Sequence, residues 1–181
     1  MNLPNKLTVF RVILIPFFVV FMLVDIFGYA DKYIALAIFI VASLTDLLDG
    51  KIARKYNLVT DFGKFMDPLA DKLLVCSALI CLIDNPIPRW IVLIIIARDF
   101  IISGFRLVAS DNGRVIAAGM WGKVKTTVQM IMIIWLILFM DEGIKVCNII
   151  GQVLIYIALI LTLVSLIDYL VRNRDVLNTN K

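Results

Sequence analysis

The stretch DLLDGKIARKYNLVTDFGKFMDPLAD, residues 46–71, separates two strongly apolar runs, YIALAIFIVASLT (residues 33–45) and KLLVCSALICLI (residues 72–83). With its flanks, each run is long enough to cross a bilayer as a helix, because about 20 apolar residues span the ~30 Å hydrocarbon core. The connection is short, so the two helices are expected to be antiparallel neighbours. Carboxylates are costly near a bilayer and usually mark function there. The aspartates of this stretch therefore become the first candidates for a functional site.

The composition of the whole chain extends this interpretation. Hydrophobic residues make up 62% of its 181 residues, whereas soluble domains contain about 45–50%. We therefore expect an all-α integral membrane protein with a single domain over residues 1–181. Its long apolar runs do not alternate in the period of two that barrel strands require. Six transmembrane helices are predicted, preceded by a short N-terminal interfacial amphipathic helix, at about residues 8–26, 33–54, 65–84, 89–109, 122–141 and 147–171.

The distribution of basic residues predicts the orientation. Of the 18 lysines and arginines, only Lys32, Arg89 and Lys145 fall on one side of the predicted helices, which leaves 15 on the other. Basic loops stay in the cytoplasm, so both termini and the aspartate-rich end are expected to face it. The net charge of +4 would attract anionic headgroups or phosphorylated substrates there, although basic loops also serve simply to orient membrane proteins.

The absence of histidine excludes some chemistries. With no histidine in the chain, neither a histidine-ligated metal nor a Ser-His-Asp triad is available. A general base must then be a carboxylate, lysine, tyrosine or cysteine. The three cysteines form no CxxC pair, and we interpret them as packing residues.

Four of the aspartates have helical spacing. Asp46 and Asp49 are three residues apart, and Asp67 and Asp71 are four apart, so each pair lies on one face of its helix. Antiparallel neighbours could bring the pairs into one four-carboxylate site. Such a site needs positive charge, and oxygen ligands suit a hard cation such as Mg²⁺, Mn²⁺ or Ca²⁺. Two ions would balance four carboxylates, as in many sites of displacement at phosphorus. Alternatively, nearby lysines and arginines neutralise the aspartates as surface ion pairs.

The full spacing is Asp-x2-Asp-Gly-x2-Ala-Arg-x8-Gly-x3-Asp-x3-Asp over residues 46–71. It resembles the signature of the CDP-alcohol phosphatidyltransferases at all eight fixed positions. Chain length and the six-helix pattern are also similar to that family. The resemblance implies a membrane enzyme in which the hydroxyl of a small alcohol attacks the phosphorus attached to diacylglycerol, and CMP leaves.

The resemblance also implies roles for the motif residues. The first three aspartates, Asp46, Asp49 and Asp67, would hold the metal, which we expect to be two Mg²⁺ or Mn²⁺ ions. Asp71 would ligate metal and act as the base that takes the hydroxyl proton, which agrees with the lack of histidine. The CDP group would be bound by Asp49, Gly50, Ala53, Arg54 and Gly63.

The N-terminus, MNLPNKLTVFR, resembles the opening of the phosphatidylglycerophosphate synthase subfamily. Asn5, Thr8 and Arg11 recur at every third residue and form a polar stripe opposite an apolar one. We expect Asn5 and Thr8 to contribute to CDP binding and Arg11 to bind the phosphate of the acceptor. The alternative is an ordinary amphipathic anchor at the membrane interface.

Two later stretches, ARDFIISGFR and GKVKTTVQ, are also similar to that subfamily, whose acceptor is sn-glycerol 3-phosphate. A phosphate-bearing acceptor needs cations beyond those that serve the CDP diphosphate. The candidates are Arg98, Arg106, Lys123 and Lys125. Alternatively, Arg98 and Asp99 form a self-neutralising structural ion pair, and the lysines act only as topology signals.

The predicted function is thus phosphatidyl transfer from CDP-diacylglycerol to sn-glycerol 3-phosphate at the cell (inner) membrane. A homodimer is expected from the family resemblance, and no nucleic-acid partner is expected. Serine, inositol phosphate or phosphatidylglycerol as acceptor remain alternatives within the family. A membrane prenyltransferase fits less well, because its aspartate motifs differ. A divalent-cation transporter also fits less well, because transport sites commonly lie near the midplane and these aspartates lie at one face.

Overall fold

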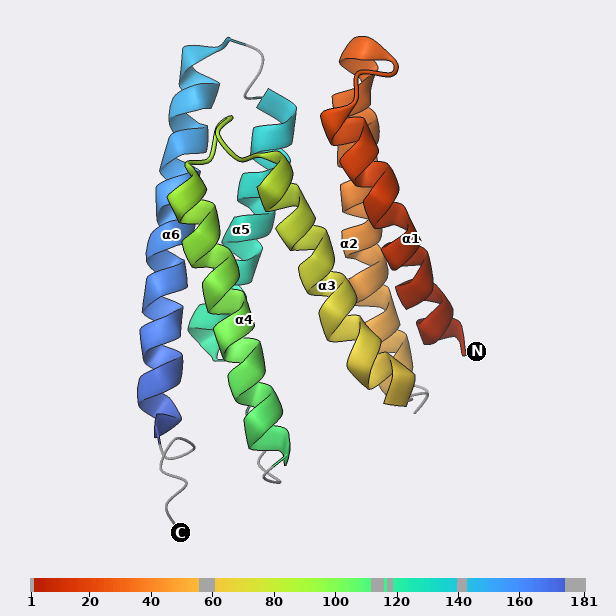
Figure 1. The fold of residues 1–181 in the computed structure, drawn as a ribbon, viewed down its shortest axis with the longest axis vertical. Helices are drawn as coiled ribbons and strands as arrows, with labels where there is room; N and C mark the ends of the chain where they lie inside the picture. The colour runs from red at the N-terminus through yellow and green to blue at the C-terminus, as the bar shows by residue number, and fades with distance from the viewer. Residues whose placement is uncertain (1, 56–60, 112–115, 117–118, 140–142, 175–181) are drawn as a thin grey trace. The chain divides into compact units, whose positions relative to one another are not determined.

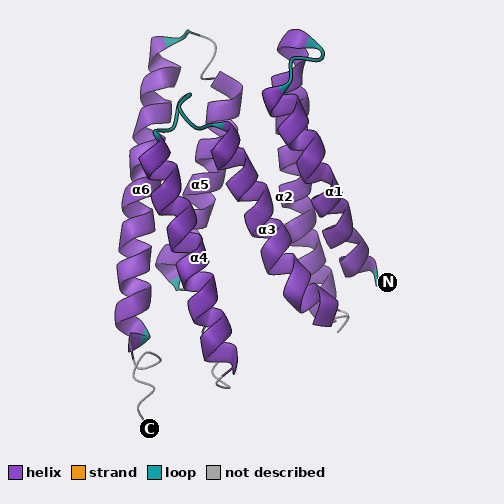
Figure 2. Cartoon of the chain, viewed as in Figure 1, coloured by secondary structure: helices purple, strands orange, loops and turns teal. Residues whose placement is uncertain are grey.

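The computed structural model describes residues 2–55, 61–111, 116, 119–139 and 143–174. Within these residues the chain is all-helical, with six α-helices, a single 3₁₀ turn and no strand (Figure 2). The elements are α1 (Leu3–Leu23), η1 (Gly28–Ala30), α2 (Asp31–Lys55), α3 (Asp61–Cys81), α4 (Arg89–Asp111), α5 (Met120–Phe139) and α6 (Lys145–Arg172). The all-α class expected from the sequence is confirmed.

The helices group into two units, Met1–Leu82 with α1, α2 and α3, and Ile83–Lys181 with α4, α5 and α6 (Figure 1). In the first unit α1 packs against both α2 and α3, and in the second α6 packs against both α4 and α5.

Small residues let α1 approach α2 closely in the N-terminal unit. Ala35 and Ala42 on α2 are fully buried, and Phe39 lies between them on the same face. The Phe39 ring packs against Phe18 of α1, with ring centroids 5.7 Å apart. Small residues at an interface let helix backbones come together in membranes, where packing replaces the hydrophobic effect as the driving force. This packing sets the rotation of α1 and therefore decides which of its residues face α2.

A short turn joins α1 to α2. Asp31, the first residue of α2, accepts hydrogen bonds from the backbone N–H groups of Ile26 and Phe27 at 2.8 and 2.9 Å. Gly28 has a φ of +67°, a left-handed conformation that glycine adopts without steric cost. The carboxylate and the glycine together make the reversal that brings the two helices side by side.

The core of the C-terminal unit consists of aliphatic side chains from all three helices. Ile91 and Ile95 lie four residues apart on α4, Met132 and Ile133 belong to α5, and Ile155 belongs to α6; all five are fully buried. The spacing of four keeps one face of α4 turned inward. Polar residues also lie inside this unit, among them Arg98, Lys125 and Ser165.

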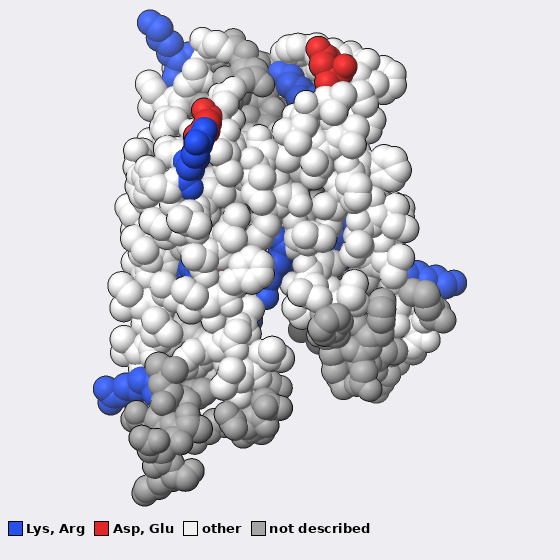
Figure 3. Space-filling view, in the orientation of Figure 1, with Lys and Arg blue, Asp and Glu red and all other residues white. Residues whose placement is uncertain are grey.

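Four helical segments of the described residues are long and apolar enough to cross a membrane: Asn5–Leu23, Gly28–Asp46, Met120–Phe139 and Lys145–Arg172. Helices α3 and α4 are long enough, but each carries charges within its apolar sequence, such as Asp67 and Asp71 in α3 and Arg98 and Asp99 in α4. The face shown in Figure 3 is mostly uncharged, as expected of a surface in contact with lipid. Six crossings therefore remain a prediction.

The N-terminal residues differ from the expectation. A short interfacial helix was expected to precede the first membrane helix, but Leu3–Leu23 is one continuous helix. The polar stripe of Asn5, Thr8 and Arg11 forms the first turns of this helix and is buried rather than exposed. The reason is that α1 packs against α2 and α3 along its length, which turns the stripe toward the interior of the unit.

Candidate active site

Helices α2 and α3 carry the four motif aspartates. Asp46 lies toward the end of α2, and Asp67 and Asp71 lie in the first half of α3, as the sequence predicts. The predicted site residues Asp49, Gly50, Ala53 and Arg54 belong to α2, but their side chains lie outside the described residues.

Arg11 of α1 holds Asp46 of α2 from the interior of the unit. Its Nη1 atom lies 2.9 Å from Asp46 Oδ1, and its Nε donates to the Ala42 carbonyl oxygen at 3.2 Å. The Arg11 side chain is fully buried, whereas that of Asp46 is 36% exposed. Arg11 thus fixes one carboxylate oxygen of Asp46 from the inside while part of the aspartate stays open.

Thr8 makes the corresponding contact to α3. Its hydroxyl Oγ1 donates to Asp67 Oδ1 at 2.5 Å, and the threonine is fully buried. Thr8 and Arg11 are three residues apart on α1, so they share a face. Asp46 and Asp67 lie close enough for their charges to repel each other. One face of α1 thus contacts two motif carboxylates on two different helices.

The remaining described residues of the predicted N-terminal site follow the same helices. Asp71 lies one turn beyond Asp67 on α3 and is partly exposed, while Gly63 lies one turn before it and is buried. Asn5 lies one turn before Thr8 on α1 and is 7% exposed. All three thus belong to the helical faces that carry the contacts of Thr8 and Arg11.

In the C-terminal unit, Asp99 is the centre of an ionic network that links α4 to α5. Lys125 Nζ donates to both carboxylate oxygens of Asp99, at 2.7 and 2.8 Å. Arg98 Nη1 donates to Asp99 Oδ1 at 2.8 Å, and its Nη2 donates to Ser165 Oγ on α6 at 2.8 Å. Two cations meet one carboxylate, so the network carries a net positive charge. Arg98 Nε is buried and has no hydrogen-bond partner among the residues that the structure describes.

The two other basic residues predicted for the acceptor phosphate have different surroundings. Arg106 is exposed, and its guanidinium lies 5.7 Å from the centre of the Tyr169 ring, within the range of a cation–π interaction. Lys123 on α5 is exposed. The structure thus gathers Arg98 and Lys125 around Asp99 and leaves Arg106 and Lys123 at the surface of their unit.

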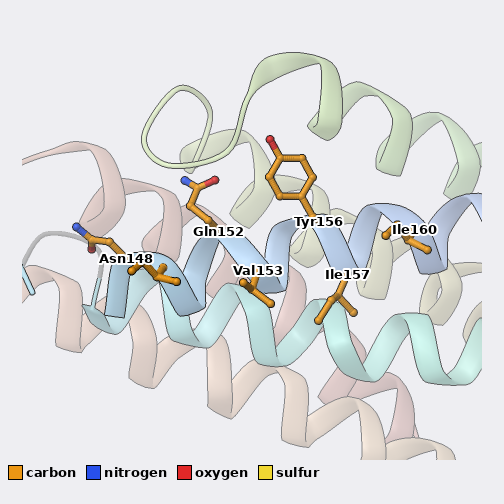
Figure 4. Close-up of a pocket in the computed structure, with 7 residues that line it drawn as sticks. Asn148, Gln152, Val153, Tyr156, Ile157 and Ile160 are labelled. Atoms are coloured by element: carbon orange, nitrogen blue, oxygen red, sulfur yellow. The ribbon is translucent and has the colours of Figure 1, made fainter. Parts of the chain in front are cut away.

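A shallow groove of about 440 Å³ runs along α6. Its lining side chains all project from that helix, and they include Gln152, Tyr156 and Ile160 at a spacing of four (Figure 4). Among the described residues, no carboxylate, lysine or arginine lines it. The groove therefore offers no charged group for catalysis or phosphate binding and is not a candidate active site.

Comparison with known proteins identifies the family. A family model for CDP-alcohol phosphatidyltransferase matches residues 1–164. The chain belongs to the CDP-alcohol phosphatidyltransferase family. A CDP-diacylglycerol–glycerol-3-phosphate 3-phosphatidyltransferase of Bacillus subtilis is 43% identical over 99% of this chain and 98% of its own length. Proteins of the same name from Haemophilus influenzae and Salmonella paratyphi A are 42% and 41% identical, each over 93% of this chain and 91% and 93% of their own lengths.

CDP-alcohol phosphatidyltransferases generally depend on divalent cations, and the described residues fit such a cation in their chemistry. The charges of Asp46 and Asp67 repel each other, and Asp71 follows Asp67 on the same face of α3. Their oxygens are the donors that Mg²⁺ and Mn²⁺ prefer. Among the described side chains, no group of three or more potential ligands is close enough to hold a metal ion. The complete four-carboxylate site, which includes Asp49, remains a prediction.

Sequence reasoning missed two features of this phosphatidyltransferase. It assigned Thr8 and Arg11 to substrates, whereas the structure shows them in contact with motif aspartates. It did not single out Ser165, which accepts a hydrogen bond from Arg98. The available signal was the pair Thr162 and Ser165, three residues apart within the apolar run of residues 157–167. A polar pair on one face of such a helix indicates a buried polar contact.

Proposed function

We propose that the protein is a CDP-diacylglycerol–glycerol-3-phosphate 3-phosphatidyltransferase. The observation that carries the proposal is the identity of 43% over nearly the full length of the Bacillus subtilis enzyme of that name. The chain transfers the phosphatidyl group of CDP-diacylglycerol to sn-glycerol 3-phosphate. The products are phosphatidylglycerophosphate and CMP, so the protein acts in phospholipid biosynthesis.

The reaction needs a base and a stabilised leaving group. In our proposal, Asp71 takes the proton from a free hydroxyl of glycerol 3-phosphate. The hydroxyl oxygen then forms a bond to the phosphorus attached to diacylglycerol, and the bond from that phosphorus to the oxygen of CMP breaks. A carboxylate is the natural base in a chain without histidine. The partial exposure of Asp71 leaves it accessible to a substrate.

The carboxylates proposed to hold the metal are Asp46, Asp49, Asp67 and Asp71. When bound, two divalent cations, Mg²⁺ or Mn²⁺, would neutralise the diphosphate and the charge that develops on CMP. The contribution of the chain is to keep the carboxylates in place. Support comes from the repulsion between the charges of Asp46 on α2 and Asp67 on α3, which a bound cation would relieve.

We assign the CDP group to Asp49, Gly50, Ala53, Arg54 and Gly63, with Asn5 as a further polar contact. Glycine and alanine leave room for the nucleotide, and arginine offers a fork for phosphate. The burial of Gly63 and Asn5 is compatible with a lining role. Thr8, also predicted for this group, donates its hydroxyl hydrogen to Asp67.

For the phosphate of the acceptor we propose Arg98, Arg106, Lys123 and Lys125. The support is electrostatic: the network of Arg98, Lys125 and Asp99 retains one positive charge. The exposed Lys123 and Arg106 would add cations that an acceptor can reach. A neutral or zwitterionic acceptor would not need this set.

We further propose six membrane crossings, with both termini and the active site in the cytoplasm, and a homodimeric assembly. The distribution of lysines and arginines, 15 against 3, supports the orientation. Labelling of single cysteines introduced into the connections tests it: reagents confined to the outside should reach residues near Lys32 and Lys145 and not those near Lys181.

The deciding experiment measures CMP release by the purified protein from CDP-diacylglycerol with Mg²⁺ or Mn²⁺. sn-Glycerol 3-phosphate, serine, inositol phosphate and phosphatidylglycerol are supplied separately as acceptors. We expect release with glycerol 3-phosphate alone. Release with another acceptor alone would keep the family and refute the assigned acceptor. Divalent-cation flux in liposomes without lipid turnover would refute the enzyme.

A further inference from the structure

Thr8 and Arg11 are two polar residues of α1 that have no solvent-exposed surface. A residue that binds a substrate phosphate must present a donor to the ligand. Arg11 contacts Asp46 through Nη1 and donates from Nε to the Ala42 carbonyl. The Thr8 hydroxyl donates its single hydrogen to Asp67. Direct substrate contact would therefore require these interactions to break.

The contacts of Thr8 with Asp67 and of Arg11 with Asp46 resemble those that orient metal-binding carboxylates in metal sites. In metal sites, a ligating carboxylate commonly has one oxygen hydrogen-bonded to a neighbouring group, which fixes its rotamer and directs the other oxygen to the metal. Thr8 and Arg11 each contact Oδ1 of a motif aspartate. Both come from one face of one helix, so a single rigid element sets the positions of carboxylates on α2 and α3.

The charge of Arg11 adds a second effect. Asp46 and Asp67 are close enough to repel each other, and burial strengthens that repulsion. A fully buried guanidinium at Asp46 offsets it within the protein. The guanidinium contacts the Ala42 carbonyl through Nε and Asp46 through Nη1, and a lysine cannot make these two contacts from two separate nitrogens.

We propose that Thr8 and Arg11 are positioning residues, which hold Asp67 and Asp46 ready for divalent cations and contact neither substrate. This replaces the roles in CDP and acceptor binding that the sequence suggested for them. The inference rests on the proposed function, because it concerns the carboxylates of that site.

The first test measures Mn²⁺ binding directly, by electron paramagnetic resonance of the purified full chain in detergent, without substrates. Thr8→Val keeps the side-chain shape and removes the donor. We expect it to weaken Mn²⁺ binding about 10–100-fold, as is typical when a group that orients a metal ligand is lost. Thr8→Ser keeps the hydroxyl, so its Mn²⁺ affinity should stay within about threefold of the wild-type value. That difference is smaller than the loss expected for Thr8→Val.

Thr126→Val is the matched control, because Thr126 is exposed on α5 and its hydroxyl donates to the Gly122 carbonyl of its own helix. It should bind Mn²⁺ like wild type. Unchanged Mn²⁺ affinity in Thr8→Val, or no Mn²⁺ binding by the wild-type protein, would overturn the proposal. If Thr8→Val does not fold, the comparison of Thr8→Ser with Thr8→Ala gives the same contrast.

The second test separates kcat from KM. Arg11→Lys keeps the charge and loses the fork, so we expect kcat to fall about tenfold or more while the KM for glycerol 3-phosphate stays near the wild-type value. A selective rise in that KM with unchanged kcat would make Arg11 a phosphate ligand and refute its positioning role.

Failure of the proposed function would give a different result from failure of this inference. If the proposed function is wrong, the wild-type protein releases no CMP, yet the Mn²⁺ comparison still decides the role of Thr8.

Discussion

Lys125 donates to both carboxylate oxygens of Asp99, at 2.7 and 2.8 Å, and only 2% of the lysine surface is exposed. A charged side chain buried inside an apolar helix bundle is costly unless it has an oppositely charged partner and hydrogen bonds. Here Arg98 joins the same carboxylate and reaches Ser165 of α6. The carboxylate therefore holds two buried cations and links three helices of the C-terminal unit.

Replacing Asp99 should show how much that network contributes to stability. Asp99→Asn leaves Arg98 and Lys125 buried without a counter-charge, and we expect a loss of about 3–5 kcal/mol in the free energy of unfolding. Unfolding by denaturant in mixed micelles measures it. Asp84→Asn is the control, because its ion pair with Arg89 is exposed and should be worth about 0–1 kcal/mol. Equal losses in the two variants would contradict this interpretation.

The close approach of α1 and α2 depends on small residues. Ala42 is fully buried on α2, so Ala42→Leu should force the helices apart and destabilise the unit by about 1–3 kcal/mol. It should also reduce activity, because Arg11 binds the Ala42 carbonyl. Ala37→Leu, on the exposed face of the same helix, should change neither. Unfolding and CMP release measured on both variants decide the matter, and a neutral Ala42→Leu would show that the interface tolerates extra volume.

The proposed base is tested by Asp71→Asn. The amide cannot take a proton, so kcat for CMP release should fall about 10²–10⁴-fold, while part of the CDP binding survives. Asp25→Asn, in the exposed turn between α1 and α2, should retain wild-type kcat. Near-normal turnover in Asp71→Asn would remove Asp71 from the role of base.

Removal of the divalent cation should stop the reaction. With EDTA in excess over metal, we expect CMP release to cease, because the carboxylates of α2 and α3 would then repel the diphosphate instead of binding it through cations. Added Mg²⁺ or Mn²⁺ should restore it. Full activity in EDTA would exclude the metal site, and restoration by only one of the two ions would identify the metal that the enzyme uses.

Lys123 is the clearest test of the acceptor phosphate, because it is exposed and its loss should not disturb packing. A hydrogen bond to a charged group contributes about 1.5–3 kcal/mol, so Lys123→Gln should raise the KM for glycerol 3-phosphate about 10–100-fold with little change for CDP-diacylglycerol. Lys145→Gln, at the start of α6, serves as the control. An unchanged KM would leave Lys123 as a topology signal.

Much of the fold follows from local properties of the sequence. The apolar runs predict helices whose observed bounds, such as Asp31–Lys55 for α2 and Arg89–Asp111 for α4, lie within a few residues of expectation. The boundary of α1 was less predictable. Its start at Leu3 depends on the burial of a polar stripe against α2 and α3, which hydropathy along the chain does not report.

By itself, the sequence determined the helical class, the family and the spacing of the motif aspartates, because hydropathy, helical period and motif spacing are properties of neighbouring residues. Only the tertiary structure decided which side chains meet. Thr8 reaches Asp67 across 59 positions of sequence, and Arg98 reaches Ser165 across 67. Such contacts depend on how each helix is rotated and how far it is shifted along its neighbours. Packing of the buried faces sets both, so a polar stripe that could have faced phosphate or membrane instead holds two carboxylates.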